Sequence, residues 1–126
     1  MLSNDIIFVA EDSLYNLCVG TSDGICRYNR ENDSFVTLQN DGRPVYVASC
    51  LSVEGGILFG GSGAIYKYDY ATRKLLPLYY ANNPDFYTPF WQMVRYDDSH
   101  ILLNSRWHGI YSFDLNTNEL EKVDYF

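Results

Sequence analysis

The sequence predicts an all-β protein built from three copies of one four-stranded antiparallel unit. The first observation behind this prediction is a repeat, in which two short apolar runs flank a tight turn and an Asn or Asp follows. Its copies occupy residues 16–29, 57–69 and 101–114. The second observation is that the apolar runs are four to six residues long, rich in β-branched and aromatic side chains, and bounded by Gly, Asn and Asp. Such runs are typical of strands and too short for helices.

The three copies align residue by residue over the second apolar run. Ile25, Ile65 and Ile110 coincide, at intervals of 40 and 45 residues. The same alignment superposes three further sets, which are Tyr28 with Tyr68 and Phe113, Asn29 with Asp69 and Asp114, and Phe35 with Leu75 and Leu120. Periods of about 40 to 50 residues with four strands per unit are typical of β-propeller blades. The sequence therefore predicts a partial β-propeller, a single domain over residues 1–126 with antiparallel blades at about residues 5–39, 45–80 and 90–126.

The four strands of each unit are predicted in chain order from its apolar runs. These runs are residues 6–10, 17–21, 25–28 and 35–38 in the first unit, 45–53, 57–61, 65–68 and 75–80 in the second, and 90–96, 101–105, 110–113 and 120–125 in the third. The central strands are apolar at nearly every position, which indicates sheets covered on both faces, as in stacked blades. A long connection, residues 81–89, leads from the second unit to the third.

The turn between the central strands of the first unit is predicted at Asp23-Gly24. An Asp-Gly pair between two strands favours a two-residue turn in which both central residues have φ > 0. This turn would place Cys18 opposite Asn29. Cys18 and Cys26 would then lie on opposite faces of the hairpin, because side chains alternate along a strand. The sequence therefore predicts no disulfide between them.

The residues that could carry chemistry do not form a catalytic or metal-binding pattern. The three cysteines are predicted to be free thiols that pack as small hydrophobes, since their spacing is not of the CxxC type and the two histidines are far along the chain. No nucleophile elbow or phosphate-binding loop is present. Asp69 and Asp114 recur with the repeat, which favours a role in capping turns. We therefore expect no catalytic residues, no metal site and no cofactor.

Charge and hydropathy exclude some classes of partner. The net charge is −7 and the isoelectric point is near 4.5, which argues against nucleic acid or an anionic membrane as a partner, since both attract positive charge. No apolar run reaches the length of about 18 residues that a membrane-spanning helix needs. The N-terminal residues predict a first strand, so we expect no secretion signal in this chain.

Three segments of the chain resemble the regulator-propeller repeat of hybrid two-component sensors. They read VGTSDGICRYNRENDSF, FGGSGAIYKYDYATRKL and HGIYSFDLNTNEL, and they are similar to the family pattern I-G-T-x-x-G-L-x-R-Y-D-x-x-T-x-x-F. The family often has Trp in its second strand, where this chain has Cys18, Leu58 and Leu102. In the third unit, Asn104 also replaces the glycine that ends this strand. The resemblance implies a periplasmic sensor segment of a membrane-anchored histidine kinase that responds to an oligosaccharide.

Three blades are too few to close a propeller, which needs about four to eight. The outward faces of the first and last blades would be apolar and uncovered. We therefore expect either that the chain packs against further blades of a longer protein, or that it associates with itself. Two copies would supply six blades.

A ligand would be expected at the rim formed by the inner-hairpin turns and the connections between blades. The candidate ligand-binding residues at this rim are Asp23, Arg43, Tyr87, Arg106, Trp107 and His108. Aromatic faces stack on the C–H face of a sugar ring, and an Arg can form paired hydrogen bonds to a carboxylate, so these residue types suit a sugar or uronic acid. In the alternative interpretation, Trp107 caps the blade and Tyr87 packs beneath it.

The resemblance implies that binding of a glycan fragment at this rim changes the geometry of a sensor and hence the activity of its kinase. Two other functions stay open at this point. The chain could belong to a propeller-fold lyase or glycosidase, or it could be a protein-interaction scaffold.

Overall fold

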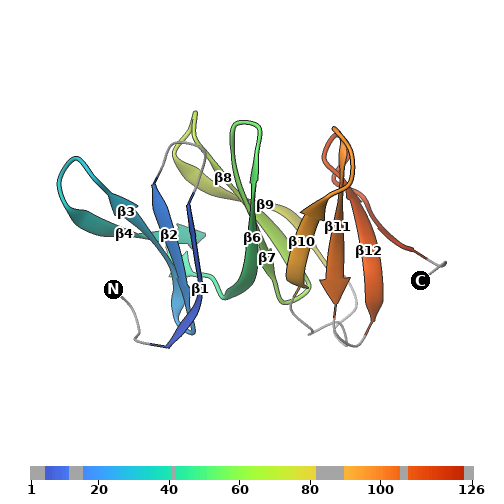
Figure 1. The fold of residues 1–126 in the computed structure, drawn as a ribbon, viewed down its shortest axis with the longest axis horizontal. Helices are drawn as coiled ribbons and strands as arrows, with labels where there is room; N and C mark the ends of the chain where they lie inside the picture. The colour runs from blue at the N-terminus through green and yellow to red at the C-terminus, as the bar shows by residue number, and fades with distance from the viewer. Residues whose placement is uncertain (1–4, 12–15, 41, 82–89, 106–107, 124–126) are drawn as a thin grey trace.

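The structure, a computed structural model, describes residues 5–11, 16–40, 42–81, 90–105 and 108–123, with only the backbone at Arg43 and Pro44. Three antiparallel sheets follow one another along the chain and lie side by side in a row (Figure 1). The described residues contain no helix. The predicted all-β fold with three blades is therefore confirmed, and the row does not close into a ring.

The first sheet has the order β1-β2-β3-β4-β5, and the other two have the orders β6-β7-β8-β9 and β10-β11-β12-β13. The strands of the first sheet are β1 Ile6–Glu11, β2 Leu17–Thr21, β3 Gly24–Asn29, β4 Ser34–Asn40 and β5 Arg43–Pro44. Those of the second are β6 Val47–Val53, β7 Gly56–Gly61, β8 Ala64–Asp69 and β9 Lys74–Tyr80. Those of the third are β10 Phe90–Arg95, β11 His100–Ser105, β12 Gly109–Asp114 and β13 Leu120–Lys122.

The predicted strands agree with these bounds to within one or two residues, with two exceptions. The last predicted strand, residues 120–125, is described only to Lys122 as a strand. The short strand β5 was not predicted, because its residues Arg43 and Pro44 were assigned to the connection between units. It extends the first sheet by pairing Asn40 with Arg43 and Gln39 with Pro44.

The backbone repeats as closely as the sequence does. The first strand of each sheet has a shift in register at the same place. The shift lies between Ile6 and Phe8 in β1, between Val47 and Ser49 in β6, and between Phe90 and Gln92 in β10. The turn before the outer strand has a residue of positive φ at the same place as well. These residues are Asp33, Arg73 and Asn118, with φ of 51°, 57° and 60°.

The predicted position of the first inner turn is wrong by one residue. Thr21 pairs with Gly24, so the two-residue loop is Ser22-Asp23. The Thr21 hydroxyl fixes this loop, because it donates a hydrogen bond to the Gly24 carbonyl at 3.1 Å and accepts one from the Asp23 N–H at 3.2 Å. Positive φ occurs at Gly24 (146°) and not at both loop residues, contrary to the prediction.

The corrected register keeps the cysteines apart. Cys18 lies opposite Arg27 and Cys26 lies opposite Val19, so the pairing is shifted by two residues and each side chain stays on its predicted face. Cys18, Cys26 and Cys50 are free thiols, as predicted, and the first two are buried while Cys50 is half-buried.

Two apolar cores fill the spaces between the sheets. The first lies between the first and second sheets and includes Ile25, Leu38, Phe59 and Tyr68. The second lies between the second and third sheets and includes Leu58, Ile65, Phe90, Phe113 and Leu103. Alternate residues of β7 enter the two cores, so every residue of this strand is buried, which confirms that its unbroken apolar sequence reflects cover on both faces.

No sheet formed by the described residues covers the outward faces of the first and third sheets (Figure 1). Val9 and Phe35 are exposed on the outward face of the first sheet, by 62% and 46%. The outward face of the third sheet is more mixed, since Val94 is 59% exposed and exposed polar residues such as Asn104 and Glu121 share this face.

Candidate functional site

The predicted rim is only partly described. Asp23 is exposed in the turn between β2 and β3, and its backbone N–H bonds to Thr21. His108 is half-buried in the turn before β12, and its backbone N–H donates to the Ser105 carbonyl at 3.1 Å. The backbone of Arg43 lies in β5. Tyr87, Arg106 and Trp107 lie outside the described residues.

The described members of this rim do not form one site. Asp23 belongs to the first sheet and His108 to the third, and the second sheet separates them (Figure 1). The proposed role of Arg106, Trp107, His108, Tyr87, Arg43 and Asp23 in ligand binding therefore stays a prediction.

The turn-capping role predicted for Asp69 and Asp114 is confirmed. Both are turn caps. The Asp69 carboxylate accepts hydrogen bonds from the Thr72 hydroxyl at 2.8 Å and the Thr72 N–H at 3.0 Å, and these bonds, the hydroxyl's above all, lower the pKa of Asp69. The Asp114 carboxylate accepts hydrogen bonds from the N–H groups of Asn116 and Thr117. Asn29, at the same repeat position, accepts one from the Glu31 N–H at 2.9 Å.

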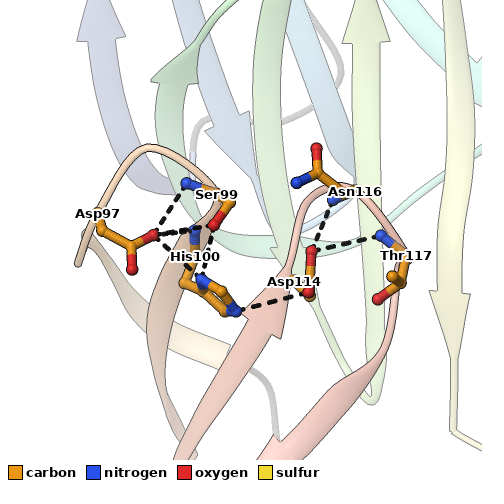
Figure 2. Close-up of polar contacts among 6 residues, drawn as sticks. All are labelled: Asp97, Ser99, His100, Asp114, Asn116 and Thr117. Carbon is orange, nitrogen blue, oxygen red and sulfur yellow. Dashed lines mark hydrogen bonds and ion pairs between the residues drawn. The ribbon is translucent and has the colours of Figure 1, made fainter.

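A polar cluster around His100 joins two turns of the third sheet, and sequence reasoning did not find it. Figure 2 shows the His100 ring between the carboxylates of Asp97 and Asp114. Its Nδ1 lies 3.0 Å from Asp97 Oδ1 and 2.8 Å from Ser99 Oγ, and its Nε2 lies 3.5 Å from Asp114 Oδ2. Asp97 precedes β11 and Asp114 ends β12, so the ring connects the β10–β11 turn to the β12–β13 turn.

The composition of this cluster resembles a Ser-His-Asp triad, but its geometry indicates a structural role. In the triad the serine hydroxyl bonds to Nε2 of the histidine and the acid to Nδ1, whereas Ser99 lies on Nδ1 of His100 together with Asp97, and the carboxylate nearest to Nε2, that of Asp114, is 3.5 Å away. Asp97 Oδ1 also accepts hydrogen bonds from the N–H groups of Ser99 and His100. These bonds lower the pKa of Asp97 to about 2, and the bond from the Ser99 N–H contributes most to this shift. Among the described residues no group of three or more His, Cys, Asp or Glu could hold a metal ion.

A second site that sequence reasoning missed is a groove between the first and second sheets, beside the β3–β4 and β8–β9 turns. Its volume is about 700 Å³. The charged residues that line it are Arg27, Arg30, Arg73 and Glu31, and the aromatic ones are Tyr68 and Tyr70. The sequence gives one signal for it, which is that Arg27 takes the repeat position that Lys67 and Ser112 have in the other units.

No helix of the described residues is long and apolar enough to cross a membrane. No family model matches the chain, and no curated protein matches it.

Solved structures match the chain closely in fold. One is the extracellular domain of a protein described as a one component system from B. thetaiotaomicron, which is 18% identical, with a TM-score of 0.81 over 100% of this chain and 17% of that chain. Another is the extracellular domain of a protein described as a hybrid two component system from the same organism, which is 20% identical, with a TM-score of 0.78 over 99% of this chain and 19% of that chain. The chain thus has the fold of part of these domains and spans less than a fifth of their length.

Proposed function

We propose that the chain is a non-catalytic sensory segment from the extracytoplasmic, periplasmic part of a two-component sensor histidine kinase, and that it responds to an oligosaccharide. The observation that carries this proposal is the likeness of the whole chain, at TM-scores of 0.78 and 0.81, to extracellular domains of signalling proteins. The repeat pattern of the sequence gives independent support, since it is similar to the regulator-propeller repeat at all three units.

The proposed mechanism uses the blades as rigid supports for the ligand. Apolar cores between the sheets hold neighbouring blades in a fixed relation. A glycan at the rim around residues 106–108 would contact the inner turns and the connections between blades. Binding there would favour one geometry of the sensor, in which these blades move together as a unit, and a shift between two such geometries is what a kinase on the far side of the membrane could read.

We also propose that the two outward faces pack against further blades, of the same parent chain or of a second copy. Equivalent residues of the repeat support this proposal. Ile25 and Ile65 are fully buried because a following sheet covers them, whereas Ile110, at the same position of the third sheet, is only half-buried. On the opposite face, Tyr68 and Phe113 are buried while Tyr28 is half-buried.

Calorimetry with a panel of neutral and acidic oligosaccharides tests the sensory proposal. We expect one or more glycans to bind the 126-residue chain, and Trp107→Ala to weaken binding at least about tenfold, because a stacked aromatic ring carries much of the contact with a sugar. Tyr96→Ala is the matched control, since Tyr96 is 65% exposed beside the β10–β11 turn, at the other end of the strands.

Two outcomes would contradict the proposal. If no glycan in the panel gives heat, a protein-interaction scaffold becomes the better explanation. If the glycan is cleaved during the titration, as chromatography of the mixture would reveal, the chain belongs to a lyase or glycosidase.

A further inference from the structure

The groove between the first and second sheets is positively charged although the protein is acidic. The net charge of the chain is −7, yet three guanidinium groups, of Arg27, Arg30 and Arg73, line the groove against the single carboxylate of Glu31 among its described lining residues. An adjoining hollow of about 450 Å³, which shares Arg73 with the groove, adds Lys74. Four of the nine Lys and Arg residues of the chain are therefore gathered at one place.

Arg27 is held in position by the second sheet. Its Cζ lies 5.1 Å from the centre of the Tyr68 ring and 5.9 Å from the centre of the Tyr70 ring. These two rings are themselves packed edge to face, with centres 6.1 Å apart. Cation–π contacts of this kind attract the guanidinium and restrict its movement. The groove thus contains a fixed cation, and Arg30 and Arg73 are exposed beside it.

The charges of the groove are not imposed by the repeat. At the equivalent junction between the second and third sheets, Lys67 replaces Arg27, Tyr70 replaces Arg30, and Asn118 replaces Arg73. The next position changes from Lys74 to Glu119. Both junctions are built by equivalent strands and turns. The fold therefore does not require the four cationic residues of the first junction, because the second junction forms with other residues at three of these positions and a single lysine at the fourth.

Arg73 stands at a backbone position that does not favour arginine. Its φ is 57°, and the equivalent residues of the other two turns are Asp33 and Asn118, at 51° and 60°. Asp and Asn are the side chains that tolerate this left-handed conformation best after glycine. An arginine at such a position has a conformational cost that a function of its side chain would offset.

We propose that this groove binds a small multivalent oxyanion, one that carries two or more carboxylate or phosphate groups. Arg forms paired hydrogen bonds to the planar or tetrahedral oxygens of such groups, and three guanidinium groups around one groove favour more than one negative charge. The volume of about 700 Å³ is in the range of small-molecule sites. The groove lies beside the β3–β4 and β8–β9 turns, so this site is separate from the glycan rim at the β2–β3 and β11–β12 turns.

Calorimetric titration of the 126-residue chain with citrate, inorganic phosphate, acetate and the neutral sugar maltose tests this inference. We expect saturable binding of citrate and phosphate that weakens as NaCl is added, because salt screens charges on a solvated surface. Acetate should bind more weakly than citrate, since it offers one charge, and maltose should give no heat at this groove.

Arg73→Asn is the main variant. It removes one guanidinium and introduces the residue that the third sheet has at the same backbone position. We expect citrate binding to weaken about tenfold, as for loss of one charge-assisted contact, and the thermal midpoint to stay the same or rise. A purely structural role for Arg73 would lower the midpoint instead. Arg27→Lys is the second variant, because it keeps the charge, matches Lys67, and removes the paired donors.

Lys122→Gln is the matched control, since Lys122 is an exposed lysine of the third sheet. Its removal should leave citrate binding unchanged. The inference is overturned if citrate and phosphate do not bind saturably, if Arg73→Asn binds citrate as tightly as the parent chain, or if Lys122→Gln weakens binding equally. Glycan binding by the Arg73→Asn variant is measured in parallel, so that failure of this site and failure of the glycan rim are distinguished.

Discussion

At the scale of single residues, short polar side chains determine the turns of this protein. Asn29, Asp69 and Asp114 each accept hydrogen bonds from backbone N–H groups that follow the third strand of a sheet. Asp97 does the same before β11. Such bonds satisfy donors that the strand ladder leaves without a partner, and they make the turn the favoured conformation locally.

The ionised state of Asp97 should contribute to stability at moderately acidic pH. The folded protein lowers the pKa of this carboxyl from its ordinary value of 3.8 to about 2. The unfolded chain therefore binds the proton more tightly, and the stabilisation present above pH 4 should be lost as pH falls from about 4 to about 2. We expect Asp97→Asn to remove this part of the pH dependence of the free energy of unfolding, measured with urea between pH 5 and pH 2.

The matched control for this prediction is Asp98→Asn, because Asp98 lies in the same turn and is exposed like Asp97. It removes a charge beside Asp97 and leaves the hydrogen bonds to Ser99 and His100 in place. An equal loss of pH dependence in both variants would show that the general charge of the turn, and not the bonds to Asp97, is responsible.

At the scale of strands and sheets, glycine permits close approach where one sheet covers the next. Gly60 is a buried residue of β7, and a Cβ at this position would lie 2.6 Å from Ser49 Oγ and 3.0 Å from the Phe90 carbonyl oxygen. Ser49 Oγ donates a hydrogen bond to that carbonyl at 2.5 Å. The second and third sheets therefore meet at this glycine with no room for a side chain.

Gly60→Ala should destabilise the protein by about 1–3 kcal/mol, the usual cost of adding a methyl group to a packed interface. Chemical denaturation followed by tryptophan fluorescence would measure the change. Asn104→Ala is the control at the equivalent position of the third sheet, where the side chain is exposed, and we expect a change within about 0.5 kcal/mol. Similar losses for both variants would argue against the interface as the cause.

The elements of this fold could largely be predicted from the sequence, because the repeat supplies the same information three times. The strand positions follow from short apolar runs, and the Asn or Asp after the third run of each unit marks the turn before the fourth strand. The first inner turn was misplaced because an Asp-Gly pair has a strong local preference, while the hydroxyl of Thr21 selects the loop one residue earlier. The strand β5 was missed because two residues that include Pro carry no strand pattern.

The groove could not be predicted, because its residues come together only when the blades pack. Arg27 lies in the first unit, while Tyr68, Tyr70 and Arg73 lie in the second. Periodicity locates each residue on a strand or turn but does not reveal which side chains meet across two sheets. The His100 cluster was missed for a similar reason, since Asp97 and Asp114 belong to different turns. The rim residues Tyr87, Arg106 and Trp107 remain predictions from the sequence.

At the scale of the whole molecule, the uncovered outward faces should cause association. We expect the 126-residue chain to form dimers or larger species, measured by light scattering, because Phe35 and Val94 expose apolar surface at the two ends of the row. Phe35→Glu and Val94→Asp should each shift the population toward the monomer. Val36→Asp is the control, since Val36 is 50% exposed but faces the groove side of its sheet. A monodisperse monomer with the spectrum of a folded β protein would contradict this expectation.

The register of the strands gives the row of sheets a direction. The side chains that β3 turns toward the second sheet, such as Ile25, correspond to those that β12 turns outward, such as Ile110. The two outward faces are thus unlike each other. The outward face of the third sheet is equivalent to the face with which the first sheet packs on the second, so it is suited to pack on the outward face of the first sheet of another copy. Contacts between copies would therefore be heterologous, head to tail, and such contacts either close into a ring or continue into a filament. The angle between neighbouring sheets decides between these assemblies, so a small change in the packing of either apolar core would alter what the molecule builds.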